Sequence, residues 1–213
     1  DRLHDLTIVV RRAKAGEILA TLDGAARALS TDMLVIADAK RPVAVAGIMG
    51  GRDTQVTPST QRIVLESAYF EPITVRRTGR QLGLTSESSY RFERGVDPVG
   101  VERASRRAAQ LIQELAGGIE RVTADAGKFR QAAAAITLSQ DRLRSRLGVT
   151  IPAATVTKSL QLLGCAVRWS GVGWRVKTPS FRRDLRQEVD LTEELARAWG
   201  KGERDRALEI LRA

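Results

Sequence analysis

The feature that most constrains the fold is a break in the sequence pattern at residues 124–135, which read ADAGKFRQAAAA. This stretch is made of small and polar residues and has little periodicity, whereas the sequence on either side is patterned. A chain of 213 residues, 43% of them hydrophobic, is long enough to build two modest domains with real cores. We therefore predict one domain over residues 1–127 and a second over residues 128–213.

The first half is dominated by short apolar runs at residues 8–10, 34–37, 43–48 and 63–65, which predict β-strands. Turn signals separate them at residues 23–24, 41–42 and 50–51. A helix is predicted after Asp97, which can cap it, with Pro98 in its first turn. Apolar residues then recur at helical spacing as far as Leu115, and Gly117 stops the helix. We expect this helix to lie on the sheet through one apolar stripe.

The second half predicts a short strand at 136–138, a helix capped by Ser139 and ended by Gly148, and another from Pro152 to Gly164. Two runs flanking the segment SGVG at 170–173 have the signature of a β-hairpin, and a last helix follows Pro179. The whole chain is thus predicted to be α+β. A domain with a mixed or antiparallel sheet and packed helices precedes a small winged-helix-like α+β domain, an architecture typical of nucleic-acid binding.

Charge is distributed unevenly between the halves. Residues 1–127 hold 18 Lys/Arg and 16 Asp/Glu, whereas residues 128–213 hold 17 and 9, so the second half carries most of the net charge of +10. This asymmetry indicates either a polyanionic or acidic partner or merely an arginine-rich solvated surface. The single cysteine, Cys165, lies in an apolar run and is predicted to be a buried thiol in a reducing cytoplasm. No apolar stretch is long enough to predict a membrane span.

The glycine-rich loop AGIMGG contains Gly47, Met49 and Gly50 and follows a predicted strand. Glycines let a substrate approach the backbone and leave N–H groups free as donors, although such a loop is also an ordinary tight turn. It matches neither the GxGxxG fingerprint nor the phosphate-binding P-loop.

Glu66 stands at the end of an apolar run, where a carboxylate is costly unless it is paired or used. It would accept a hydrogen bond from a substrate hydroxyl or form an ion pair with Arg76, Arg77 or Arg80. Ser86 and Ser88 lie in a serine-rich segment typical of a solvated turn. Neither histidine nor cysteine lies near, so the sequence supports no nucleophile–base pair, and no catalytic residue is assigned.

Four carboxylates stand within eleven residues near the end of the chain: Asp184, Asp190, Glu193 and Glu194. On a helix, the last three share one face, where like charges repel unless a cation offsets them. Carboxylate oxygens suit Mg²⁺, but acidic residues also favour a helix N-terminus through the macrodipole alone.

Four segments resemble, in order, the beta chain of bacterial phenylalanyl-tRNA synthetase. They are GEILATLDG, MLVIADAKRPVAVAGIMGG, VLESAYFEPITVRRTGRQLGLTSESSYRFERGVDP and TPSFRRDLRQEVDLTEELARAWG. The likeness runs from about residue 7 to residue 200. It implies that the first domain hydrolyses tyrosine wrongly attached to the phenylalanine tRNA, because a phenylalanine pocket cannot fully reject an analogue that only adds a hydroxyl.

By this resemblance, Glu66 would accept the tyrosine hydroxyl, the loop at 47–51 would bound the pocket, and Ser86 and Ser88 would line it. An attacking water would cleave the ester. Two departures stand out: the family's editing histidine lies in a His-Ala-Phe-Asp stretch just upstream of Asp1 and is not matched by His4, and Ser88 replaces a small alanine.

The resemblance also implies that the four late carboxylates bind Mg²⁺ at the contact with the catalytic alpha chain of an α2β2 assembly. ATP would bind only in that holoenzyme, so we expect the isolated chain not to charge tRNA. The start at Asp1 and the unmatched tail after Gly200 suggest a fragment. Two alternatives stay open: a non-catalytic RNA-binding module, and a scaffold that only docks the alpha chain.

Overall fold

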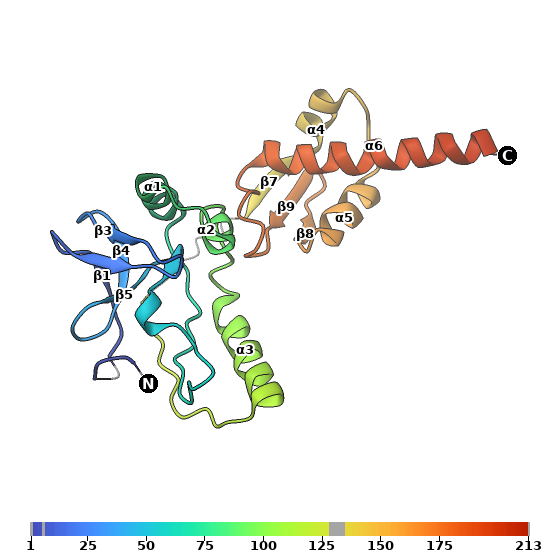
Figure 1. Ribbon diagram of the computed structural model, residues 1–213. Helices are drawn as coiled ribbons and strands as arrows, with labels where there is room; N and C mark the ends of the chain where they lie inside the picture. The colour runs from blue at the N-terminus through green and yellow to red at the C-terminus, as the bar shows by residue number, and fades with distance from the viewer. Residues whose placement is uncertain (1, 6, 128–134, 213) are drawn as a thin grey trace. The chain divides into compact units, whose positions relative to one another are not determined.

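The computed structural model describes residues 2–5, 7–127 and 135–212 and divides the chain into two compact units, residues 1–124 and 125–213 (Figure 1). Residues 128–134 of the unpatterned segment therefore lie outside the described residues. Each unit has its own hydrophobic core. The fold class is α+β: antiparallel sheets with helices, followed by a small α+β unit.

The first unit is built on an antiparallel sheet with the order β1-β4-β5-β6, and β2 and β3 form a separate hairpin. The turn of this hairpin contains Gly24 at φ +86°, in agreement with the turn predicted at 23–24. The bounds are β1 Val9–Arg12, β2 Ile18–Ala20, β3 Ala26–Ala28, β4 Leu34–Ala37, β5 Pro42–Val45, β6 Met49–Gly50 and the 3-10 helix η1 Arg52–Thr54.

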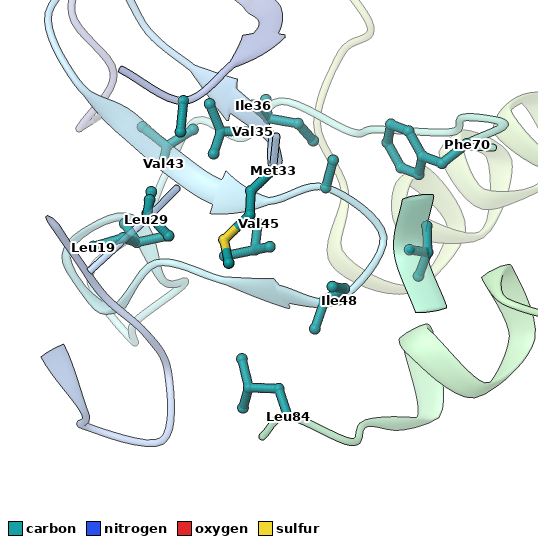
Figure 2. Close-up of a cluster of buried hydrophobic side chains, with 13 residues drawn as sticks. Leu19, Leu29, Met33, Val35, Ile36, Val43, Val45, Ile48, Phe70 and Leu84 are labelled. Carbon is teal, nitrogen blue, oxygen red and sulfur yellow. The ribbon is translucent and has the colours of Figure 1, made fainter. Parts of the chain in front are cut away.

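Three helices follow: α1 Pro72–Leu82, α2 Glu87–Phe92 and α3 Val101–Ala116. The sequence analysis predicted neither α1 nor α2, although both carry local signals. Pro72 occupies the first turn of α1 and Gly83 ends it in the left-handed region. Figure 2 shows how α1 and α2 join the core: Ile48, on the turn after β5, faces Leu84, from the turn between the two helices.

The strand predicted at residues 63–65 is wrong. The segment has no regular structure, and Ile63, Val64 and Leu65 are 51%, 59% and 40% exposed. A strand needs a neighbour to hydrogen-bond with, and none of β1–β6 pairs with this run. The strand predicted at 43–48 is also shorter than expected, because the backbone turns after Val45.

Two expectations about α3 are also wrong. The helix begins at Val101 and not after Asp97, because the Asp97 carboxylate accepts the N–H of Val99 and closes a turn before the helix. Its apolar stripe does not pack into the core, since α3 buries no residue. It runs instead beside the irregular chain between η1 and α1 (Figure 1), where the Ser67 hydroxyl donates to the Val101 carbonyl at 2.8 Å.

The second unit agrees with its predicted element order. It contains β7 Ile136–Ser139, α4 Gln140–Leu147, α5 Ala153–Leu162, β8 Ala166–Trp169, β9 Gly173–Lys177 and α6 Glu188–Arg212. The strands form one antiparallel sheet in the order β7-β9-β8. Ser139 caps α4 by accepting the N–H of Arg142, and Gly148 ends it at φ +70°. The fully buried Trp174 lies in the core of this unit, to which all three helices contribute residues.

Candidate functional site

The glycine loop and the serine segment, about forty residues apart in sequence, meet in the first unit. The Ser86 hydroxyl donates to the carbonyl of Ile48 at 2.6 Å, and the Ser88 hydroxyl donates to the carbonyl of Gly47 at 3.0 Å. Ser86 is also the N-cap of α2, where it accepts the N–H of Ser89 at 3.0 Å. The segment predicted to be a solvated turn is therefore the capped start of a helix fixed to the loop.

Gly47 is required by its surroundings. Its φ is +69°, and a Cβ at this position would lie 3.0 Å from Phe70, and 3.2 Å from both Phe92 and Val75. Phe70 and Phe92 pack with ring centroids 5.1 Å apart. Sequence reasoning did not identify this aromatic pair as the support of the loop, because only the fold brings residues 70 and 92 together.

Met49 and Gly50 form β6 and are partly buried. Gly50 opposes Ala44 of β5, so this part of the loop is itself a short strand paired with the main sheet. The loop is therefore held on both sides, by β5 and by the two serine hydroxyls. Backbone held in this way is preorganised, which a binding site needs.

Glu66 lies in the irregular segment that precedes α1. The residue as a whole is exposed, but burial of its carboxyl group raises its pKa. Within the described part of the chain no ion pair joins Glu66 to Arg76, Arg77 or Arg80, and no cation contributes to its pKa shift. No hydrogen bond between described residues links Glu66 to the loop or to the serines. The ion-pair alternative is thus not the observed one, and no described residue compensates the carboxyl group.

A hollow in this unit is lined by Arg41, Asp53 and Thr54 and by Gly51, the last residue of the glycine loop. None of the six predicted pocket residues lines it. The backbone N–H of His4 donates to the Asp38 carboxylate at 3.2 Å.

The four late carboxylates do not converge on a metal site. Asp184 and Glu194 are both bound by the Arg182 guanidinium, at 2.6 and 2.8 Å. Glu193 pairs with Arg197 at 2.7 Å. No group of three metal-binding side chains in the described residues is close enough to hold an ion. As arranged here, these carboxylates do not fit Mg²⁺.

The fourth carboxylate, Asp190, has a local structural role. It accepts the N–H groups of Arg186 and Gln187 at 2.8 and 2.9 Å, so it caps the start of α6. Hydrogen bonding from Arg182 holds the pKa of Asp184 below its ordinary value despite partial burial. Arg182, the centre of this network, was not predicted from the sequence, although its position two residues before Asp184 was a usable signal.

Cys165 is buried and free, as predicted, and burial raises the pKa of its thiol, which argues against a nucleophile. No helix among the described residues has the length and apolar character needed to cross a membrane.

The fold and the site define a class of protein in which an α+β domain, whose glycine loop is held by a capped helix, is followed in sequence by a small α+β domain. Residues 1–117 match the model of the B3/4 domain, and residues 136–200 match that of the tRNA synthetase B5 domain. The chain belongs to the family of the phenylalanine–tRNA ligase beta subunit, of which it carries these two domains in order.

The relatives are beta subunits of phenylalanine–tRNA ligase from several bacteria. The chain is 47% identical over 201 residues to that of Moorella thermoacetica and 45% identical over 202 residues to that of Protochlamydia amoebophila. It is 46% identical over 202 residues to that of Xanthomonas campestris pv. campestris. Each match covers 94% of this chain and 25% of the relative, so the chain spans about a quarter of their length.

Proposed function

We propose that this chain acts as part of the beta subunit of a cytoplasmic phenylalanine–tRNA ligase. In the assembled enzyme an alpha subunit would catalyse the ATP-dependent charging of the phenylalanine tRNA. The observation that carries the proposal is the presence of the B3/4 and B5 domains in order over nearly the whole chain. The chain by itself is not expected to charge tRNA.

The first unit would contribute hydrolysis of tyrosine misattached to that tRNA. The residues proposed for the pocket are Gly47, Met49, Gly50, Glu66, Ser86 and Ser88. Two features of the structure support this role. The loop backbone is fixed by the Ser86 and Ser88 hydroxyls, and among the described residues no cation compensates the Glu66 carboxyl group. An unpaired carboxyl group is available to accept a hydrogen bond from a tyrosine hydroxyl, which phenylalanine lacks.

Magnesium binding is proposed only for the assembled ligase. The carboxylates of Asp184, Glu193 and Glu194 are paired with arginines, and that of Asp190 caps α6. An ion shared with the alpha subunit would require these pairs to open and the partner to supply further ligands. We assign no reaction step to it.

The test is deacylation of tyrosyl-tRNA specific for phenylalanine, by this chain and by a longer beta chain assembled with its alpha subunit, each with and without Glu66→Ala. We expect Glu66→Ala to reduce the rate of hydrolysis of the tyrosyl ester by at least tenfold. The reason is that the substitution removes one hydrogen bond to a charged group, which contributes about 1.5–3 kcal/mol. Glu71→Ala, at the N-cap of α1, is the matched control and should leave the rate unchanged. An active enzyme insensitive to Glu66→Ala would remove Glu66 from the pocket.

A further inference from the structure

The irregular segment at residues 178–187, between β9 and α6, is fastened to α6 by one arginine side chain. The Nε and Nη2 atoms of Arg182 donate to the two carboxylate oxygens of Asp184 at 3.0 and 2.6 Å, which is a bidentate contact. The same Nη2 atom donates to Oε1 of Glu194, on α6, at 2.8 Å. A single cation therefore joins the segment to the helix, and we call this arrangement the Arg182 lock.

The Arg182 lock is partly withdrawn from solvent. The side chains of Arg182 and Glu194 are 20% and 13% exposed, whereas that of Asp184 is 60% exposed. Hydrogen bonding to Asp184 raises the pKa of Arg182 despite partial burial, and Glu194 adds to this effect. Because salt screens partly buried pairs much less than exposed ones, we expect the lock to persist at physiological ionic strength.

The Arg182 lock and a divalent cation need the same oxygen atoms. Mg²⁺ is bound through carboxylate oxygens, but Arg182 contacts both oxygens of Asp184 and Oε1 of Glu194. The same Oε1 atom also accepts a hydrogen bond from Arg197 at 3.3 Å. A guanidinium group does not lose its proton in proteins, so only movement of Arg182 frees these oxygens. The negative charge that a metal ion would compensate is thus already compensated from within the chain.

We infer that Arg182 is the resident counter-ion of the late carboxylates and keeps divalent cations away from them in the free chain. The inference does not depend on the proposed function, because residues of this chain alone form the lock. It means that the segment and α6 are held together by a guanidinium group and not by a metal ion. Any ion or partner that uses the carboxylates of Asp184 and Glu194 has first to displace Arg182 from both.

Cys165 can report opening of the lock, because the locked segment packs on the turn that carries it. Cys165 is 5% exposed, and a Cβ added at the preceding Gly164 would lie 3.2 Å from the Phe181 ring. Burial raises the pKa of the Cys165 thiol, whereas the charge of Arg182 lowers it. Removal of Arg182 would by itself make the thiol less reactive, so a faster reaction means that the thiol has become exposed.

The experiment measures the rate at which an aromatic disulfide reagent modifies Cys165, the only cysteine of the full 213-residue chain. We expect Arg182→Gln to raise this rate about tenfold, because it removes charge-assisted hydrogen bonds to two carboxylates. Asp184→Asn, at an exposed position, weakens one of the two contacts and should raise the rate about threefold. The matched control is Arg197→Gln, which removes the same charge from an exposed pair with Glu193 and should change the rate less than about twofold.

The same reaction tests the exclusion of magnesium. In the parent chain, MgCl₂ and NaCl of equal ionic strength should give the same rate, because Arg182 holds the oxygens that the ion needs. Three results would overturn the inference: an unchanged rate for Arg182→Gln, an equal rise for Arg197→Gln, or a parent rate that differs between the two salts. Tryptophan fluorescence shows whether Arg182→Gln has unfolded, in which case Asp184→Asn decides. The reaction involves neither tRNA nor an ester, so its outcome is independent of the proposed function.

Discussion

The helices α3 and α6 show the same kind of sequence pattern but differ in what covers them. Both carry apolar residues at helical spacing, and both form. Leu191 and Leu195 of α6 are 0% and 2% exposed and lie in the core of the second unit, whereas Leu115 of α3 is 84% exposed. The difference teaches that periodicity determines which side of a helix is apolar but not which surface that side meets.

The largest expected effect tests this difference directly. Leu191→Ala should lower the free energy of unfolding of the second unit by about 2–5 kcal/mol, because it opens a cavity in a closed core. Leu115→Ala should change stability by about 0.5 kcal/mol or less. All three tryptophans lie after residue 168, so tryptophan fluorescence during urea unfolding reports the second unit, and hydrogen exchange reports α3. Equal costs for the two substitutions would mean that α3 is packed in solution.

The next effect concerns the crowded position of Gly47 in the first unit. Gly47→Ala should destabilise that unit by about 1–3 kcal/mol, since the new methyl group would press on Phe70, Phe92 and Val75 while the backbone keeps a positive φ. Gly24→Ala is the matched control: its φ is +86°, but nothing lies within 4 Å of the added Cβ. Thermal unfolding of the two variants separates crowding from backbone strain. If both lose the same stability, the aromatic pair does not constrain the loop.

A smaller loss of stability is expected when Glu188, the first residue of α6, is replaced. Glu188 accepts the N–H of Ser139 at 2.9 Å and pairs with Arg142 at 3.1 Å. Burial by itself would raise the pKa of Glu188, but these two donors outweigh it, so the pKa lies below its ordinary value of 4.5. Because the pKa of Glu188 is lower in the folded state, its charge stabilises the fold at pH values above the ordinary pKa. This stabilisation is lost as the pH falls through the pKa of the folded state.

Glu188→Gln should therefore destabilise the second unit by about 1–2 kcal/mol at neutral pH, with the difference from the parent chain shrinking as the pH falls below 4.5. Urea unfolding monitored by tryptophan fluorescence at several pH values measures this. The control is Glu193→Gln, in an exposed pair with Arg197, where the expected change is about 0.5 kcal/mol or less. A difference that persists unchanged in acid would show that Glu188 does not act through its charge.

Much of the second unit could be predicted because its signals are local. Ser139, Gly148 and Gly164 mark helix ends, and the glycine-containing turn at 170–173 joins β8 to β9. Such signals depend on φ preferences and on capping hydrogen bonds that span a few residues. The domain boundary after residue 127, which the unpatterned segment suggested, stays a prediction.

The candidate site was predicted only in part. The sequence indicated the glycine loop, Glu66 and the serines as separate features, and the resemblance joined them into one pocket. It did not indicate that Ser86 and Ser88 bind the loop carbonyls or that Arg182 binds two of the late carboxylates. The serine contacts join residues 38 and 41 positions apart, and Arg182 and Glu194 are 12 positions apart, so no local pattern encodes them. Only the contact between Arg182 and Asp184 is local.

The sequence by itself determined the family, the α+β class, the order of elements in the second unit and the excess of positive charge there. Only the tertiary structure decided which patterned segments find partners: residues 63–65 have no neighbouring strand, α3 has no core, and the late carboxylates meet arginines. The physical reason is that propensity and periodicity act within one turn or one strand. Burial, strand pairing and charge compensation depend instead on residues that the fold brings from elsewhere in the chain.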